Sequence, residues 1–149
     1  MIVLTEVINH HSPNLIDRQP DYTLALTAEE RTRSRLRYES IEGELLQLQL
    51  SRGTVLHHGD FLVTELKDKY VRVTAKPEPI ITVTAHRDID LIRAAYHLGN
   101  RHVPLEVKPN YLRFSPDSVL EDMLHHLGLE IIAEIAPFQP ESGAYGHSH

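Results

Sequence analysis

The sequence predicts an α+β protein with three parts: a small N-terminal all-β domain, a ferredoxin-like domain of order β-α-β-β-α-β, and a flexible histidine-containing tail. Short segments that alternate apolar and polar residues, separated by turn residues, fill much of the first half of the chain. After residues 76–79 the pattern changes, and strand-like and helix-like segments alternate. From Pro140 onward the chain is rich in Pro, Gly, Ser and His, a composition typical of a mobile tail.

The β domain is predicted from a two-residue hydrophobic period. Residues 33–38 and 44–50 alternate polar and apolar side chains, and Ile41-Glu42-Gly43 between them predicts a hairpin turn. Two further strands are expected at residues 61–65 and 70–75. Several short strands at close spacing favour a small sandwich or barrel.

Lys76-Pro77-Glu78-Pro79 separates the two halves of the chain. Proline fixes φ and lacks an N–H donor, so two prolines in four residues are not expected in a central strand or a helix interior. We therefore expect domains at residues 1–76 and 77–138, followed by a tail at residues 139–149.

The first helix of the ferredoxin-like domain is predicted at residues 88–98. Ile89, Ile92 and Tyr96 are expected to form its apolar face, and Gly99 its end. The strands expected in this domain are residues 80–84, 103–107, 111–114 and 131–135.

The second helix has the clearer pattern. Ser115 is expected to be its N-cap, Pro116 to lie in its first turn and Gly128 to end it. The expected apolar stripe is Val119, Leu120, Met123, Leu124 and Leu127.

Composition excludes several classes of function. The chain has 149 residues, no cysteine and a net charge of -6, so disulfides and thiolate metal ligands are excluded. A mildly acidic chain is a poor binder of nucleic acid, because phosphate neutralisation supplies most of the non-specific affinity. With neither a signal peptide nor a long apolar run in this sequence, we expect a cytoplasmic protein that does not bind membranes.

Eleven histidines are the unusual feature of the composition. His10 and His11, and likewise His57 and His58, fall in expected loops, where solvated side chains are the simplest interpretation. The pair at residues 125–126 lies in the last turn of the second helix, where the helix dipole favours a cation.

Four other histidines are candidate metal ligands. His97 and His102 flank the end of the first helix, but a spacing of five residues does not place both on one helical face. His147 and His149 lie in Gly-His-Ser-His, a segment that could turn both imidazoles toward one ion. A purification tag and chance are the competing explanations for this pair. Imidazole suits nickel, copper and zinc.

Enzymatic chemistry is not indicated. The acidic residues 88, 90, 117, 121 and 122 lie near helix starts, where the helix dipole explains them. The sequence contains no nucleophile elbow, no His-Glu-x-x-His and no phosphate loop. We therefore expect a protein that is not an enzyme.

Four segments of the chain resemble those of a known family. Residues 94–105 read Ala-Ala-Tyr-His-Leu-Gly-Asn-Arg-His-Val-Pro-Leu, and they resemble the signature segment of the urease accessory protein UreE family. Residues 52–60 resemble its N-terminal domain, and residues 119–124 and 138–147 its C-terminal part. Matches in both halves, in the same order, make coincidence an unsatisfactory explanation.

The resemblance implies a nickel metallochaperone that delivers Ni²⁺ to apo-urease together with the urease GTPase. It implies that the β domain contacts partners and that the ferredoxin-like domain forms a homodimer. The central metal histidine of the family corresponds to His102, with His97 in a supporting role and His147 and His149 able to complete the site. Zn²⁺ or Cu²⁺ could bind in vitro. We expect one tightly bound ion per dimer.

Three alternatives remain open at the level of sequence. The first is a protein-interaction or assembly module whose histidines are incidental. The second is an RNA-binding ferredoxin-like domain, for which Tyr111 and Phe114 would be the exposed aromatic residues. The third is a metalloenzyme, although no trio of ligands for catalytic zinc is legible.

Overall fold

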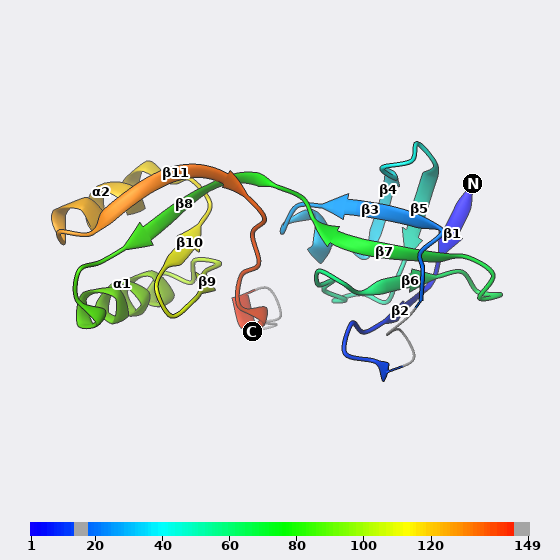
Figure 1. Ribbon diagram of the computed structural model, residues 1–149, viewed down its shortest axis with the longest axis horizontal. Coiled ribbons are helices and arrows are strands. Elements are labelled where there is room, and N and C mark those ends of the chain that lie inside the picture. The colour runs from blue at the N-terminus through cyan, green and yellow to red at the C-terminus, as the bar shows by residue number, and fades with distance from the viewer. Residues whose placement is uncertain (14–17, 145–149) are drawn as a thin grey trace. The chain divides into compact units, whose positions relative to one another are not determined.

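The structure is a computed structural model that describes residues 1–13 and 18–144. The chain folds into two compact units, unit 1 at Met1–Lys76 and unit 2 at Pro77–His149. Unit 1 is built of strands, and unit 2 combines strands with two α-helices (Figure 1). The predicted α+β class, with an N-terminal β domain and a C-terminal α+β domain, is therefore confirmed.

Unit 1 contains two sheets. The first has the order β1-β5-β4, with β1 at Ile2–Leu4, β5 at Leu45–Gln49 and β4 at Arg35–Glu39. The second has the order β2-β6-β7-β3, with β2 at Glu6–Ile8, β6 at Phe61–Val63, β7 at Tyr70–Ala75 and β3 at Tyr22–Leu26. A short 3₁₀ turn lies at Glu30–Thr32. Leucines and valines of both sheets share one buried cluster, which is the core of this unit.

The expected hairpin in unit 1 is confirmed, since β4 and β5 pair antiparallel around Gly43, whose φ is 94°. The sequence patterns missed β1, β2 and β3. The first two strands have three residues each, too few to show a period. The chain passes from the first sheet to the second at Thr5, whose backbone amide donates a hydrogen bond to the carbonyl of Val63 at 3.0 Å. β1 and β3 pair in parallel with β5 and β7, distant contacts that local patterns do not reveal.

Unit 2 has the ferredoxin-like order. Its elements are β8 (Glu78–Thr84), α1 (Asp88–Asn100), β9 (Glu106–Val107), β10 (Leu112–Phe114), α2 (Ser118–His126) and β11 (Glu130–Ala136). The sheet order is β11-β8-β10-β9 with every pair antiparallel. Buried residues from both helices and from β8 and β10 form one cluster, so both helices cover the same face of the sheet.

Pro79 lies inside β8, contrary to the expectation that residues 76–79 hold no central strand. It pairs with Ile135 of β11, while β10 pairs only with Ile81 to Val83. At Pro79, β8 therefore has a strand neighbour on one side only, and an edge position tolerates a missing N–H.

The expected apolar face of α1 is wrong. The residues that pack into the core are Leu91, Ala94, Ala95 and Leu98. Ile89, Ile92 and Tyr96 lie on the opposite side and are exposed, Ile92 by 63% and Tyr96 by 65%. The large residues Ile89, Ile92 and Tyr96 predicted the core side, but the buried side is the one that carries two leucines and two alanines.

The expected N-cap of α2 is also wrong. Asp117, and not Ser115, accepts hydrogen bonds from the amides of Val119 and Leu120 at 3.0 and 3.2 Å. Ser115 and Pro116 therefore precede the helix and lie outside it. The predicted end at Gly128 is confirmed by its φ of 81°.

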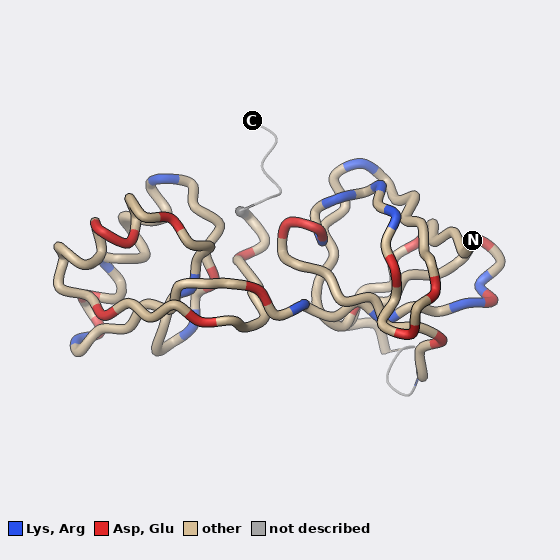
Figure 2. The backbone as a smooth tube through the Cα atoms, turned by 90° about the horizontal axis from the view of Figure 1, so that it is seen from above, with Lys and Arg blue, Asp and Glu red and all other residues tan. Residues whose placement is uncertain are grey.

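Charges and helix lengths bear on possible partners. Lys and Arg positions are interspersed with Asp and Glu along the backbone of both units (Figure 2). Among residues 1–13 and 18–144, no helix is long and apolar enough to cross a membrane.

Candidate metal centre

His102 occupies the turn that ends α1. The amide of His102 donates to the carbonyl of Gly99 at 3.0 Å, and the amide of Val103 donates to the carbonyl of Leu98 at 3.3 Å. This pair of hydrogen bonds is the Schellman motif, in which the residue at the position of His102 adopts a left-handed conformation. The turn therefore holds the backbone of His102 at a defined place directly after the helix.

The conformation of His102 is unusual for its residue type. Its φ is 57°, and Lys67 is the only other described non-glycine residue with a positive φ. Glycine is the usual residue here because a side chain in this conformation costs about 1–2 kcal/mol. The expectation that Gly99 ends the helix is thus wrong, since Gly99 lies within α1 and His102 makes the turn. A non-glycine residue in this conformation motivates the hypothesis that its side chain has a function.

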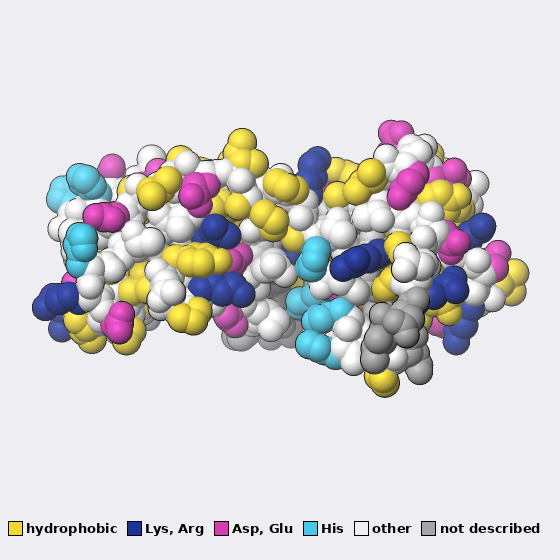
Figure 3. Space-filling model, viewed as in Figure 1, with side chains coloured by type: hydrophobic (Ala, Val, Ile, Leu, Met, Phe, Trp, Pro, Cys, Tyr) yellow, Lys and Arg dark blue, Asp and Glu magenta, His cyan; other side chains and the backbone are white. Residues whose placement is uncertain are grey.

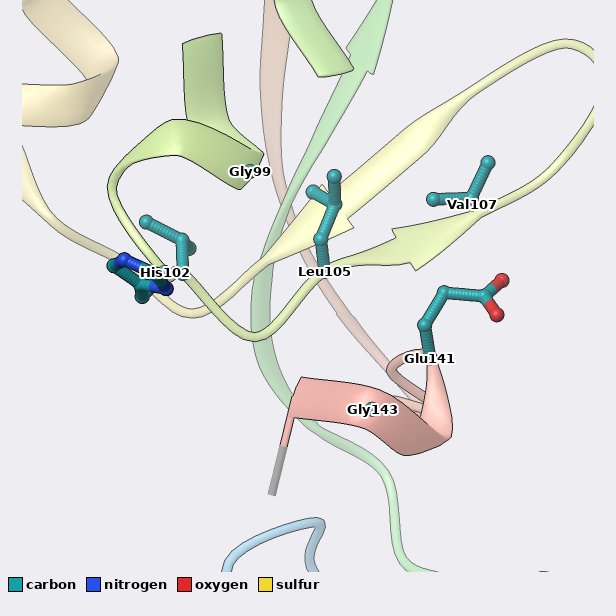
Figure 4. Close-up of a pocket in the computed structure, with 7 residues that line it drawn as sticks. Gly99, His102, Leu105, Val107, Glu141 and Gly143 are labelled. Carbon is teal, nitrogen blue, oxygen red and sulfur yellow. The ribbon is translucent and has the colours of Figure 1, made fainter. Parts of the chain in front are cut away.

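Two hollows border the exposed His102. One, of about 280 Å³, is lined by His102 and by Gly99, Leu105, Glu141 and Gly143, among others (Figure 4). The other, of about 320 Å³, is lined by His102 and by residues of the segment before α2. In Figure 4 the Glu141 carboxylate points toward Val107 and away from His102. The imidazole therefore has open space around it, and Glu141 in the first hollow does not point at it.

Two hydrogen bonds donated by backbone amides hold the C-terminal segment, from residue 139 onward, beside the first hollow. The amide of Gln139 donates to Oε1 of Glu106 at 2.7 Å, and the amide of Glu141 donates to the carbonyl of Leu105 at 2.8 Å. The following 3₁₀ turn, η3 at Ser142–Ala144, contributes Gly143 to the lining. These bonds bring the start of the tail to the hollow that His102 lines.

The other predicted ligands are not brought to His102 within the described residues. His97 lies half-buried in the last turns of α1, edge-on to the Tyr96 ring at 5.5 Å between centroids, and lines neither hollow. His147 and His149 lie outside the described residues. Within residues 1–13 and 18–144, no three His, Asp or Glu side chains converge closely enough to hold a metal ion.

The segment before α2 offers no second set of ligands. Ser115, Pro116 and Asp117 line the second hollow beside His102. The Asp117 carboxylate is engaged as the N-cap of α2. At the start of α1, the Arg87 guanidinium donates two hydrogen bonds of 3.0 Å to Asp90, and they lower the pKa of that carboxyl.

The sequence suggested that the histidines of unit 1 are solvated, but two of them make specific hydrogen bonds. His10 bonds through Nδ1 to the buried Asp60 at 2.8 Å, and Nδ1 of His58 accepts from the amide of Ala75 at 3.1 Å. The sequence shows that His57, His58 and Asp60 are neighbours in the chain. Their proximity to His10 arises only from the pairing of β2 with β6. Sequence spacing alone could not have revealed this cluster.

Comparison with known proteins addresses the chain as a whole. Residues 4–76 match the model of the N-terminal domain of the UreE urease accessory protein, and residues 78–149 match that of its C-terminal domain. The chain is similar to the protein named urease accessory protein UreE in Nostoc sp., with 55% identity covering 100% of this chain and 99% of that protein.

Two further relatives carry the same name. The protein of Nostoc punctiforme is 59% identical over 89% of this chain and 90% of its own length. That of Thermosynechococcus vestitus is 50% identical over the full length of both chains. Both domain models and the full-length relatives agree with the family resemblance of the sequence. The chain belongs to the UreE family of urease accessory proteins.

Proposed function

We propose that this protein is a nickel carrier that delivers Ni²⁺ to apo-urease during assembly of the urease active site. Its family membership supports a role in urease maturation. The observation that carries the metal-binding part is His102, an exposed histidine held in a left-handed turn between two hollows. Nickel is the cargo in this proposal, and the protein itself has no catalytic role.

The position of His102 suits a carrier. A turn at the end of a packed helix fixes the backbone, while the imidazole remains at the surface and can exchange a ligand. A single histidine is a weak site, so other ligands are needed. A two-fold interface is self-complementary, and a residue near its axis meets its own copy. Two copies of His102 would then share one ion in a homodimer.

The exposed side of α1 supports the homodimer. Ile89, Ile92 and Tyr96, here called the α1 apolar face, lie at helical spacing on one side of the helix. A groove of about 330 Å³ adjoins Ile92 and is lined by further apolar residues, including Leu91, Ala95, Val107 and Pro109. A second copy of this chain is the partner that we assign to this surface, since apolar burial would stabilise the pair.

The tail would supply the remaining ligands. His147 and His149 follow Gly143 by four and six residues, a reach of at most roughly 14 and 22 Å for an extended chain. Gly143 lines the same hollow as His102, which together with this reach supports the proposal that a tail imidazole would meet the ion. His97 has a supporting role at best, since it lines neither hollow.

The partners in this proposal are the urease apoprotein and its accessory proteins, including the urease GTPase, all in the cytoplasm. Unit 1 would contact these partners and unit 2 would carry the ion. Nucleic acid and membranes are not among the proposed partners. The interspersed charges of both units suit protein surfaces better than a polyanion (Figure 2).

Calorimetric titration of nickel into the tag-free full chain, with mass measured by light scattering, tests the proposal. We expect a dimer that binds about one tight ion per two chains, and a His102→Asn variant that loses this event. Asparagine tolerates the left-handed conformation, so the turn is preserved. His86→Ala is the matched control, because His86 is exposed and pairs only with Glu130 among the described residues.

Unchanged nickel binding in His102→Asn would contradict the proposal. The protein would then be better explained as an interaction or assembly module with incidental histidines. Several tight ions per dimer would contradict the stoichiometry alone. Loss of binding in the His86→Ala control would instead indicate a general defect in the titrated protein.

A further inference from the structure

A second group of histidines gathers in unit 1. His10 and His11 follow β2, and His57 and His58 precede β6, which pairs with β2. Histidine side chains cluster on one face of this unit in Figure 3. Asp60 lies beneath them with 2% of its surface exposed. Two chain segments fifty residues apart thus contribute imidazoles to one surface patch over one buried carboxylate.

Asp60 orients the ring of His10. Its Oδ1 accepts from the backbone amide of His10 at 2.9 Å and from Nδ1 of the same residue at 2.8 Å. Because a carboxylate accepts, Nδ1 carries the proton, and in the neutral ring Nε2 keeps a free lone pair. Metal-binding histidines typically have this outer carboxylate, which fixes the tautomer and the ring direction.

Asp60 also holds the opposite segment. Its Oδ2 accepts from the amide of His57 at 2.8 Å and lies 3.7 Å from Nδ1 of that ring. Gly59, with a φ of 93°, permits the close approach, because a Cβ at this position would lie 3.2 Å from Cβ of His10. The backbones of both segments are therefore fixed around the same carboxylate.

The ring spacings suit a shared ion. The His10 ring centroid lies 3.9 Å from that of His11 and 5.9 Å from that of His57. With a metal–nitrogen distance of about 2.0–2.1 Å, two imidazoles on one ion have centroids roughly 5 Å apart. The three rings, all among the described residues, do not converge in the structure. His11 is exposed and the His57 side chain is 42% exposed, so both side chains have room to rotate, and a shared ion requires that they do.

His58 is not part of this set. Its Nδ1 accepts the amide hydrogen of Ala75 at 3.1 Å, so this nitrogen is engaged in holding β7. The neutral ring then carries its proton on Nε2 and has no free lone pair for a metal. Three of the four histidines of the patch are therefore available as ligands.

We propose that unit 1 carries its own site for a borderline divalent cation such as Ni²⁺, Cu²⁺ or Zn²⁺. His10, His11 and His57 are the ligands, and Asp60 is the outer partner of His10. The site is separate from the one at His102 and does not depend on it. Imidazoles without thiolates or inner carboxylates suit these ions. The need for side-chain rotation makes this a weaker site than a preassembled one.

Nickel titration of a background variant tests the site alone. The full chain carries His102→Gly, His147→Ala and His149→Ala, and binding is measured by calorimetry and by paramagnetic broadening of histidine signals in NMR spectra. We expect residual binding that broadens the signals of His10 and His57. Adding His10→Ala should abolish it, and Asp60→Asn should weaken it by about 10–100-fold. His86→Ala, the exposed control, should leave it unchanged.

Absence of nickel binding in the background variant, or binding unaffected by His10→Ala, would overturn the proposal. Asp60 accepts hydrogen bonds from two segments, so its substitution could unfold unit 1. His57→Ala and His11→Ala avoid this problem, since both side chains are at the surface, and each should weaken binding in a chain whose amide spectrum is unchanged. Failure of the His102 site is measured separately, in the chain that retains His102.

Discussion

The backbone amide of Gln139 donates a hydrogen bond of 2.7 Å to the side chain of Glu106. Glu106 is 3% exposed, and its other oxygen lies 3.4 Å from the Tyr111 hydroxyl and 3.8 Å from Arg113. A buried carboxylate with these partners is a rigid anchor. It holds the segment that leads from β11 to the hollow beside His102.

Replacing Glu106 by alanine should therefore release the C-terminal segment. Its partners would lose their acceptor, and an unsatisfied buried group costs about 1–3 kcal/mol. Hydrogen exchange should show faster exchange of the Gln139 and Glu141 amides, with α2 unaffected. Glu106→Gln keeps an oxygen acceptor for Gln139 and should retain most of the protection. Equal exchange in both variants would mean that Glu106 does not anchor the segment.

The left-handed conformation of His102 predicts that glycine at this position gives a more stable protein than alanine, the reverse of the usual order in a helix. Glycine adopts this conformation without strain, whereas in alanine it costs about 1–2 kcal/mol. His102→Gly should therefore be more stable than His102→Ala by about 1 kcal/mol, although both lose the imidazole. Urea denaturation measures the difference. A more stable alanine variant would show that the φ of 57° does not describe the protein in solution.

The α1 apolar face predicts the effect of charge on association. Ile92→Asp and Tyr96→Asp place a carboxylate where a second copy would pack, and each should weaken the dimer about tenfold or more. Sedimentation over a range of concentrations measures the dissociation constant. Val119→Asp is the control, because Val119 of α2 is 73% exposed but outside that face. Weakening by Val119→Asp alone would place the interface on α2.

Glu42 predicts a dependence of stability on pH. The Thr23 amide donates to this carboxylate at 2.9 Å, and that hydrogen bond lowers the pKa of Glu42 below its ordinary value of 4.5. The unfolded chain then binds more protons, so the contribution is complete above about pH 4.5 and is lost as the pH falls through the lowered folded value. Urea midpoints at about pH 6 and about pH 3.5 should therefore differ less in Glu42→Gln than in the parent. An identical difference would exclude this contribution.

Much of the fold followed from local patterns. The alternation in β4 and β5, the turn at Gly43 and the end of α2 at Gly128 each depend on neighbouring residues, so the sequence predicted them. β1 and β3 were missed because their partners are distant parallel strands. Pro79 was not expected within a strand. At Pro79, however, β8 has β11 as its only strand neighbour, and such an edge position tolerates the missing N–H.

The candidate sites divide in the same way. Segments in both halves of the chain, at residues 52–60, 94–105, 119–124 and 138–147, identified the family from sequence, and no spacing rule could have done so. The left-handed turn at His102 was hidden, because Gly99 nearby has the residue type that more often ends a helix. The patch around Asp60 was hidden for a different reason, since fifty residues separate His10 from its carboxylate.

The sequence by itself determined the α+β class, the ferredoxin-like order of unit 2 and the family, and its lack of cysteine excluded thiolate ligands. Only the tertiary structure decided which side of α1 is buried, where the helix ends and which histidines share a carboxylate. The reason is physical. Periodicity and residue type report on neighbours within a few positions, whereas burial and hydrogen bonding between distant segments exist only after the chain has packed.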